Sequence, residues 1–324
     1  MMVWKPSILL TRRWPAEVET RLQERYSVVL NEPDVPLTRA QLRQAMRDHD
    51  ALCPTVTDML DAAILDVESR RVRFIGNYGA GHQHIDVAAC RALGIAVSNT
   101  PDVLTDATAN LAITLMLMTA RRASEGERLV RGGRWEGWSP VQLLGHDLDG
   151  RMLGLVGFGR IGQAVALKAR LAFGMRIGWH GRNPDRPADP RLDAVYFETL
   201  DALLAEADIV SLHIPGGEQT RHLIDCRRLA LMKPEAILIN TARGTVVDES
   251  ALAEMLRTKR IAGAGLDVYE REPKVDPALL GLENVVLLPH LGSATSDTRR
   301  AMGMRVADNL DAFFFGGAPP DLVV

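Results

Sequence analysis

Short apolar runs alternate with longer amphipathic segments along the second half of the chain. From about residue 150, runs rich in β-branched and other apolar side chains recur at 152–156, 176–180, 194–197, 208–213, 236–241, 263–268 and 285–290. The segments between them have helical periodicity, as in ESALAEMLRTK over 249–259. Such alternation favours βαβ units, in which helices cover both faces of a parallel sheet. We predict a doubly wound α/β domain here.

The first hundred residues show a looser version of the same pattern. Strand candidates lie at 6–11, 26–30, 51–55, 73–77 and 95–100, which predicts a second, smaller α/β domain. Long helices are expected at 105–122, crossing between the domains, and at 293–314, returning the chain to the first domain. We therefore expect one domain from residues 1–100 and 291–324, built from both termini, and another from residues 101–290.

Composition narrows the classes of function. The 324 residues carry 38 basic and 41 acidic side chains, a net charge of −3, and no stretch concentrates Lys and Arg, so we expect no nucleic-acid partner. Cys53, Cys90 and Cys226 are widely spaced, which suits a reducing compartment better than a disulfide framework. No window has the roughly 20 apolar residues that span a bilayer, and no signal peptide is recognisable. We expect a soluble cytoplasmic protein without membrane contact and without a metal site.

The run MLGLVGFGRIGQAVA, at 152–166, places Gly157, Gly159 and Gly162 in GxGxxG spacing between a strand and a helix. The first glycine permits a tight turn, the second lets the backbone approach a pyrophosphate, and the third lets the helix pack closely on the strand. The helix N-terminus would face the diphosphate. The position of the motif disfavours the alternative, a glycine-rich turn without a ligand, and predicts a Rossmann dinucleotide-binding domain at 101–290.

The segment HGRNP, at 180–184, ends the next predicted strand. In NAD-binding sites a carboxylate about 20 residues beyond the glycines binds the ribose 2′-hydroxyl. Gly181, Arg182 and Asn183 stand there instead: glycine leaves room for a 2′-phosphate, and arginine offers a charge-assisted fork. We therefore expect NADP(H). NAD stays the alternative, because Arg182 could be a solvated turn residue and Asp185 adds a negative charge nearby.

Three later strands end in residues suited to catalysis, and ligands of open α/β sheets bind beyond the carboxyl ends of the strands. Arg243 follows the fifth strand, Asp267 lies inside the sixth with Glu272 beyond it, and His290 lies at the tip of the seventh. Histidine exchanges a proton near neutral pH, and Glu272 could fix its tautomer. Arg243 could hold a carboxylate and polarise a carbonyl. Each could also be an ordinary surface residue, but together with the glycine motif they predict reduction of a 2-oxo acid.

Seven stretches of the chain together resemble the D-isomer-specific 2-hydroxyacid dehydrogenases over essentially the whole length. They are GNYGAGHQHID (76–86), NTPDVLTDATANLA (99–112), LGLVGFGRIGQAVA (153–166), LHIPGGEQTRHLID (212–225), MKPEAILINTARGTVVDESAL (232–252), AGAGLDVYEREP (262–273) and LPHLGSAT (288–295). The resemblance implies that the family's catalytic Arg, Glu and His are Arg243, Glu272 and His290. It also implies a flavodoxin-like substrate-binding domain built from the two ends of the chain.

The same resemblance implies binding residues. The loop YGAG would hold the substrate carboxylate on the backbone amides of Ala80 and Gly81. HGRNP looks most like the NADPH-dependent glyoxylate and hydroxypyruvate reductases, and RWEGWSP (134–140) resembles their dimer loop, so that Trp138 would reach the partner's substrate pocket in a homodimer. Besides the glycines and HGRNP residues named above, cofactor contacts are expected at Thr108, Phe158, Arg160, Ile161, Pro215, Thr220, Thr241, Asp267, His290, Gly292 and Ser293.

We therefore expect an NADPH-dependent reductase that converts a small 2-oxo acid, glyoxylate or hydroxypyruvate, to its D-2-hydroxy acid. An NADH-preferring enzyme is one alternative. Reduction of 2-ketogluconate or an aryl pyruvate is another, because His82 and His84 beside the carboxylate loop do not define substrate size. A dinucleotide sensor or corepressor could share the fold, but the complete Arg–Glu–His set favours an enzyme.

Overall fold

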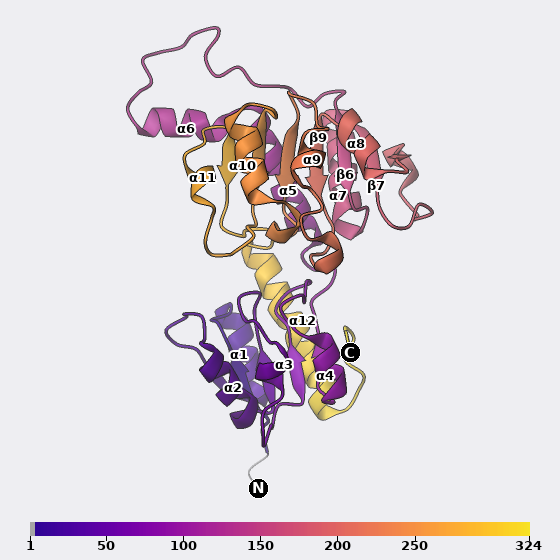
Figure 1. The fold of residues 1–324 in the computed structure, drawn as a ribbon. Coiled ribbons are helices and arrows are strands. Elements are labelled where there is room, and N and C mark those ends of the chain that lie inside the picture. Colours follow the sequence, from indigo (N-terminus) through magenta and orange to yellow (C-terminus); the bar gives the residue numbers. More distant parts are fainter. Residues whose placement is uncertain (1–3) are drawn as a thin grey trace. The chain divides into compact units, whose positions relative to one another are not determined.

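The computed structural model describes residues 4–324, and the chain divides into two compact units. The terminal unit comprises Met1–Leu104 and Ser293–Val324, and the central unit comprises Thr105–Gly292. Figure 1 shows the terminal unit in indigo and purple with a yellow C-terminal helix, and the central unit in colours that run from the purple of α5 through magenta to orange. The expected boundaries, after residues 100 and 290, fall a few residues before the observed ones.

The central unit contains a parallel sheet whose strand order is β12-β11-β10-β9-β6-β7-β8. The order runs outward from β6 in both directions, as in a Rossmann fold, so the chain reverses its winding between β6 and β9. Ligands of such sheets bind in the crevice at this switch point. The strands are β6 (Met152–Val156), β7 (Arg176–His180), β8 (Val195–Tyr196), β9 (Ile209–Leu212), β10 (Ile237–Asn240), β11 (Gly263–Leu266) and β12 (Val285–Leu287).

Helices cover both faces of this sheet, which explains the nearly continuous apolar runs of its strands. Along β6, Leu153 and Leu155 join one buried cluster with α5 and α7, whereas Met152 and Val156 join the opposite cluster with α8, α9 and α10. The helices are α5 (Thr105–Ala120), α6 (Ala123–Arg131), α7 (Arg160–Phe173), α8 (Leu200–Glu206), α9 (Cys226–Leu229), α10 (Glu249–Arg257) and α11 (Pro277–Leu280), with short 3₁₀ turns at Pro190–Leu192, Glu218–Thr220 and Gly244–Val246.

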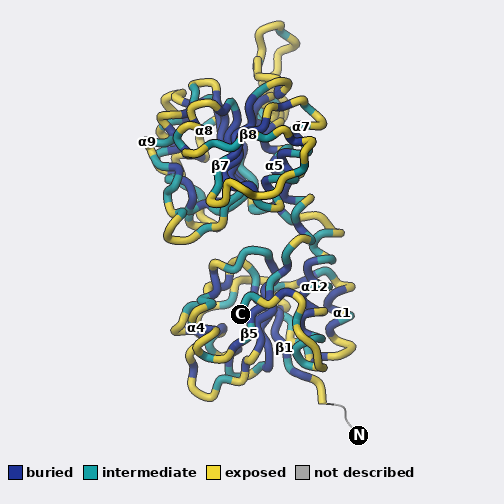
Figure 2. Tube along the Cα trace, turned by 90° about the vertical axis from the view of Figure 1, so that its right-hand side faces the viewer, coloured by how far each residue is buried: buried dark blue, intermediate teal, exposed yellow. Residues whose placement is uncertain are grey.

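The terminal unit is a smaller α/β unit with its own core. Its parallel sheet has the order β2-β1-β3-β4-β5, which is the flavodoxin-like order. In Figure 2, dark blue follows the strands at the centre of each unit. The elements are β1 (Ser7–Leu10), α1 (Ala16–Arg25), β2 (Ser27–Leu30), α2 (Arg39–Asp48), β3 (Ala51–Cys53), α3 (Ala62–Leu65), β4 (Phe74–Gly76), α4 (Val87–Ala92), β5 (Ala96–Ser98) and α12 (Ser296–Phe315).

Two details differ from the sequence-based expectations. Asp267 was expected inside the sixth strand of the central sheet, but β11 ends at Leu266, so Asp267 is the first residue of the loop beyond it. The helix expected at 105–122 begins at the first residue of the central unit and packs there against α7 and the strands β10 and β11. Among residues 4–324, no helix is long and apolar enough to cross a membrane.

Candidate active site

A cavity of about 620 Å³ lies at the carboxyl ends of β6, β7 and β9, at the switch point of the central sheet. Its volume falls in the range of about 300–1,000 Å³ that is typical of small-molecule and cofactor sites. Of the residues expected to contact a dinucleotide, seven line it: Gly157, Phe158, Gly181, Arg182, Asn183, Pro215 and Thr220.

The glycine loop has the geometry that a dinucleotide requires. Gly157 has φ 96°, and a Cβ there would lie 2.5 Å from the carbonyl oxygen of His213. A Cβ on Gly162 would lie 2.4 Å from the carbonyl oxygen of Gly157, so side chains are excluded where helix α7 meets the loop. A Cβ on Gly159 would meet nothing within 4 Å. The backbone at the start of α7 is therefore open to a diphosphate, while its two flanking glycines allow the close packing.

The end of β7 supplies positive charge to the same cavity. Arg182 and Asn183 line it, and so does Arg186, which the sequence analysis did not single out. The Asn183 side chain is engaged in the turn, because its Oδ1 accepts the backbone N–H of Asp185 at 3.1 Å. Asp185 itself is not among the lining residues. Two arginines therefore face the cavity where one was expected, and a second basic residue four positions after Arg182 was the available signal.

Two further groups near the site add no charge to it. Burial lowers the pKa of His213, another lining residue, to about 3, so its imidazole is neutral. At the end of β10, the Thr241 hydroxyl is buried and has no hydrogen-bond partner within residues 4–324. Buried hydroxyls are nearly always paired, so an orphaned one beside a predicted cofactor position fits a missing ligand contact.

His290 and Glu272 form a hydrogen-bonded pair in the loops beyond β12 and β11. The two side chains meet at 2.8 Å between His290 Nδ1 and Glu272 Oε2, and both are about one-third exposed. Glu272 Oε1 accepts the backbone N–H of Tyr269 at 3.1 Å. Burial opposes ionisation of Glu272, but the hydrogen bond and charge of His290 outweigh it and hold the pKa of Glu272 below its ordinary value. The pair leaves His290 Nε2 as the nitrogen that can serve a ligand.

The backbone of His290 is held in an unusual conformation by Asp267. His290 has φ 57°, in the left-handed region that non-glycine residues rarely adopt. Its N–H donates to the Asp267 carbonyl at 2.9 Å, and the Asp267 carboxylate accepts the N–H groups of Leu291 at 2.6 Å and Gly292 at 2.8 Å. Burial raises the pKa of Asp267 although these bonds oppose the shift. Asp267 therefore braces the turn that presents His290, a role that the sequence analysis did not foresee.

Arg243 follows β10 and lies close to both the Glu272–His290 pair and the cavity. Burial lowers the pKa of Arg243, although the Glu272 carboxylate opposes the shift, and the guanidinium stays charged. Its charge in turn contributes to the low pKa of Glu272. Gly216 lines the cavity, and a Cβ placed on it would lie 3.1 Å from Arg243 Cγ. The guanidinium-bearing side chain thus packs directly against the wall of the dinucleotide cavity.

The remaining expected site residues lie elsewhere. Thr108 donates its hydroxyl to the carbonyl of Gly292 at 3.1 Å, beside the Asp267 brace. Ala80, Gly81 and Ser293 belong to the terminal unit. Trp138 lies in the segment after α6 with 82% of its surface exposed. The structure therefore brings Arg243, Glu272 and His290 together and places the carboxylate-loop residues in the other unit.

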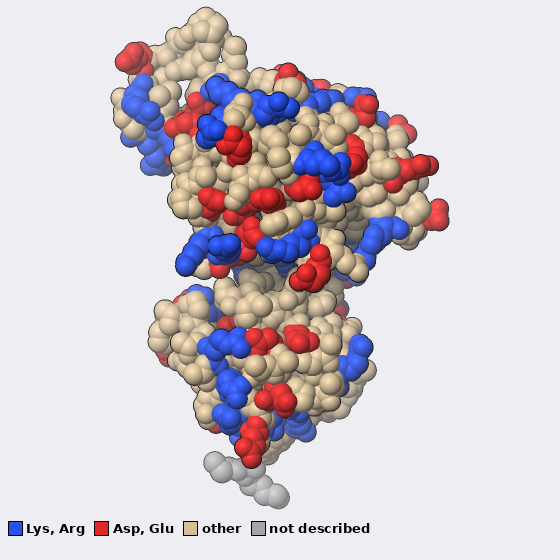
Figure 3. Space-filling view, viewed as in Figure 1, with Lys and Arg blue, Asp and Glu red and all other residues tan. Residues whose placement is uncertain are grey.

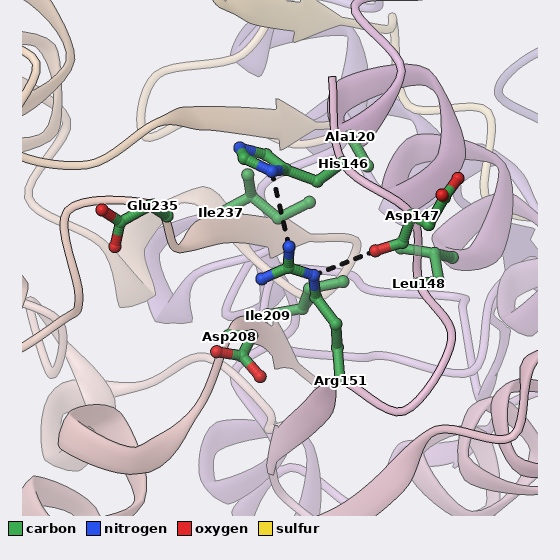
Figure 4. A pocket seen from close by; sticks show the side chains of 9 residues that line it. All are labelled: Ala120, His146, Asp147, Leu148, Arg151, Asp208, Ile209, Glu235 and Ile237. Atoms are coloured by element: carbon green, nitrogen blue, oxygen red, sulfur yellow. Dashed lines mark hydrogen bonds between the residues drawn. The ribbon is translucent and has the colours of Figure 1, made fainter. Parts of the chain in front are cut away.

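A second cavity, shown in Figure 4, does not compete for a ligand. It has a volume of about 10 Å³, roughly the space for one water molecule, and lies near the amino-terminal ends of the central strands. Arg151 crosses it, donating to the carbonyl of Asp147 at 3.0 Å and contacting His146 Nδ1 at 3.4 Å. The contacts of Arg151 in this cavity stabilise the local structure.

These features define a nicotinamide-dinucleotide-dependent dehydrogenase: a Rossmann sheet with an open glycine loop, arginines at the end of β7, and a cluster of an arginine, a glutamate and a histidine. Comparison with known proteins gives the family. Residues 113–292 match the family model described as "D-isomer specific 2-hydroxyacid dehydrogenase, NAD binding domain". The chain belongs to the D-isomer specific 2-hydroxyacid dehydrogenase family, as the resemblance in its sequence predicted.

Relatives and solved structures agree with this assignment along the whole chain. A glyoxylate reductase of Thermococcus onnurineus (strain NA1) is 45% identical over 98% of this chain and 96% of its own. The structure of an NADPH-dependent glyoxylate/hydroxypyruvate reductase from Sinorhizobium meliloti, in complex with NADP and malonate, superposes with a TM-score of 0.88 at 38% identity, covering 99% of this chain and 97% of that one. A glyoxylate reductase structure from Paecilomyes thermophila gives a TM-score of 0.85 at 34% identity, covering 99% of both chains.

Proposed function

We propose that this protein reduces glyoxylate or hydroxypyruvate with NADPH. The observation that carries the proposal is the Glu272–His290 pair, 2.8 Å between heavy atoms, with Arg243 packed beside it against the dinucleotide cavity. A proton donor, its orienting carboxylate and a guanidinium are the groups that reduction of a 2-oxo acid requires from the protein. The relatives named above as glyoxylate or glyoxylate/hydroxypyruvate reductases support the choice of substrate.

Each residue then has a defined task. His290 donates a proton from Nε2 to the carbonyl oxygen of the substrate, and Glu272 holds the imidazole through Nδ1 and stabilises its protonated form. Arg243 pairs with the substrate carboxylate and stabilises negative charge on the carbonyl oxygen, which its fork of donors suits better than a lysine would. Asp267 fixes the turn that aims His290. Ala80 and Gly81 would bind the substrate carboxylate through backbone N–H groups.

The cavity residues fit a nicotinamide dinucleotide, which supplies the hydride when it is bound. Gly157–Gly162 and the start of α7 would hold its diphosphate, and Arg182 with Arg186 would pair with a 2′-phosphate. Thr241, whose buried hydroxyl has no hydrogen-bond partner within residues 4–324, would supply one contact. Thr108, Pro215, Thr220, Gly292 and Ser293 complete the proposed contacts.

Arg182→Ala should lower kcat/KM for NADPH by about 10- to 100-fold, the worth of one hydrogen bond to a charged group. Turnover with NADH should stay within about twofold, because no 2′-phosphate is then present to pair with. Arg191→Ala is the matched control: Arg191 lies on the same stretch but pairs with Asp189 at 2.5 Å and does not line the cavity. Equal losses with both cofactors would refute the assignment of Arg182.

The substrate is tested with a panel of 2-oxo acids and the two reduced cofactors, followed by absorbance at 340 nm. Highest kcat/KM with glyoxylate or hydroxypyruvate and NADPH is expected. A preference for NADH, or for 2-ketogluconate or an aryl pyruvate, would replace that part of the proposal. No oxidation of either cofactor with any acid would favour a sensor over an enzyme.

We further propose that the chain forms a homodimer through the segment after α6. This segment carries several large apolar side chains that are exposed to solvent. In addition to Trp138, Trp135 is 54% exposed, Val141 73% and Leu144 64%. In Figure 3 the loop that extends beyond α6 shows few charged side chains, whereas charges of both signs are mixed over the rest of the visible face. Several large exposed apolar side chains on one segment support an interaction site there.

Replacing Trp138 and Leu144 together with serine should convert a dimer into a monomer, as measured by sedimentation velocity. Both side chains are removed from the apolar segment, so the association would lose its anchors. Leu171→Ser is the matched control, because Leu171 is also 62% exposed but lies on α7. A wild-type protein that sediments as a monomer at micromolar concentration would overturn the dimer.

A further inference from the structure

All three carbonyl oxygens of the loop Gly79–Ala80–Gly81, in the terminal unit, accept hydrogen bonds. Asn77 Nδ2 donates to the carbonyl of Gly79 at 2.9 Å and to that of Gly81 at 3.0 Å. Asn99 Nδ2 donates to the carbonyl of Ala80 at 2.7 Å. The carbonyl of Gly79 also accepts the backbone N–H of Thr100 at 3.1 Å. Two asparagine amides, from the ends of β4 and β5, therefore hold three successive carbonyls.

Holding a carbonyl also fixes the N–H group of the next residue. In a trans peptide the C=O of one residue and the N–H of the next lie in one plane and point in opposite directions. The Gly79 carbonyl thus sets the direction of the Ala80 N–H, and the Ala80 carbonyl sets that of Gly81. Neither of these N–H groups donates to another group within residues 4–324. Adjacent N–H groups presented in this way form an anion-binding concavity.

The asparagines are themselves held in place. Asn77 is fully buried, and its Oδ1 contacts Nε2 of the buried His84 at 3.0 Å. Because Oδ1 can only accept, the imidazole carries its proton on Nε2, and the amide of Asn77 is oriented with Nδ2 toward the loop. An aspartate in either place would present oxygen to the carbonyls and repel them. The residue type needed here is an amide.

We propose that Asn77 and Asn99 are positioning residues for substrate binding: they turn the N–H groups of Ala80 and Gly81 outward to receive the carboxylate of the 2-oxo acid. This inference rests on the proposed function, in which these N–H groups bind that carboxylate. The asparagines would act on affinity for the substrate through the loop carbonyls that they hold.

The experiment compares Asn77→Ala and Asn99→Ala with Asn31→Ala in the full-length protein. Asn31 is a matched control, because its Nδ2 also donates to two loop carbonyls of the terminal unit, Thr11 at 2.8 Å and Val35 at 2.6 Å. The readouts are kcat and KM for glyoxylate, the Kd of oxalate measured by calorimetry with NADP⁺ present, and Tm. Asn99 is only half-buried, so its variant keeps the test valid if Asn77→Ala does not fold.

Asn77→Ala and Asn99→Ala should raise the KM of glyoxylate and the Kd of oxalate together by about 5- to 10-fold, the net worth of one hydrogen bond. The kcat at saturating glyoxylate should stay within about twofold, and Asn31→Ala should lower Tm without changing KM or Kd. Lower Tm with unchanged KM and Kd in all three variants would overturn the inference. If the wild type binds oxalate but reduces no 2-oxo acid, the proposed function fails while the Kd comparison still decides the role of the asparagines. A wild type that neither binds oxalate nor reduces any 2-oxo acid would overturn both.

Discussion

Replacing His290 with alanine is expected to lower kcat by about 10²- to 10⁴-fold, the range that general acid catalysis contributes. The variant loses the only group that the account assigns to proton donation, while Arg243 and the glycine loop are unchanged. The Kd of NADPH, followed by its fluorescence, should therefore change little. Glu272→Gln should give a smaller loss, near the lower end of the same range, because the amide keeps the shape of Glu272 but not the charge that stabilises protonated His290.

His222→Ala is the control for this experiment. His222 is another histidine that is about one-third exposed and bonded to a glutamate, with His222 Nε2 3.0 Å from Glu270 Oε1, but it has no assigned catalytic role. Its variant should keep kcat within a few-fold of wild type. Near-normal turnover by His290→Ala would show that another group donates the proton.

Replacing Arg243 with alanine is expected to raise KM for the 2-oxo acid and lower kcat by about 10²- to 10³-fold, as for loss of a donor to the developing oxyanion. Both parameters change because the guanidinium pairs with the substrate in the ground state and binds the carbonyl oxygen more strongly in the transition state. Arg243→Lys should recover only part of the loss, because a lysine keeps the charge but not the fork of donors.

Arg227→Ala provides the comparison for arginine removal. Arg227 pairs with Asp201 at 2.6 Å on the surface of the central unit, so its loss should leave both kinetic parameters unchanged. A change in KM alone for Arg243→Ala, with kcat preserved, would restrict Arg243 to substrate binding. Complete rescue by lysine would contradict the role of the guanidinium fork.

Most of the fold could be predicted from the sequence. The runs MLGLV and RIGWH coincide with β6 and β7, because strands buried on both faces are continuously apolar and end abruptly at turn residues. Strand order was not readable from the pattern alone, since it depends on packing between distant elements. It followed from the position of the glycine motif and from the family resemblance. The flavodoxin-like and Rossmann orders of the two sheets agree with both expectations.

The site was predictable at the level of residue type rather than orientation. A glutamate and a histidine at the ends of neighbouring strands indicated a pair, because the carboxyl ends of parallel strands share one edge of the sheet. The left-handed backbone of His290 and the two N–H groups bonded to Asp267 were not predictable, because they depend on a turn conformation that no local residue preference requires. Arg186 was missed although its position four residues after Arg182 was visible in the sequence, because the geometry of the turn decides which of its arginines line the cavity.

The most direct test of the central claim follows the hydride. Glyoxylate is incubated with the protein and NADPH that carries deuterium at one C4 position, each configuration in turn, and the glycolate is analysed by mass spectrometry. Deuterium is expected on C2 of glycolate with one of the two cofactors, and this transfer should be lost in His290→Ala. Glycolate without deuterium from either cofactor, or no glycolate at all, would contradict the proposed reduction.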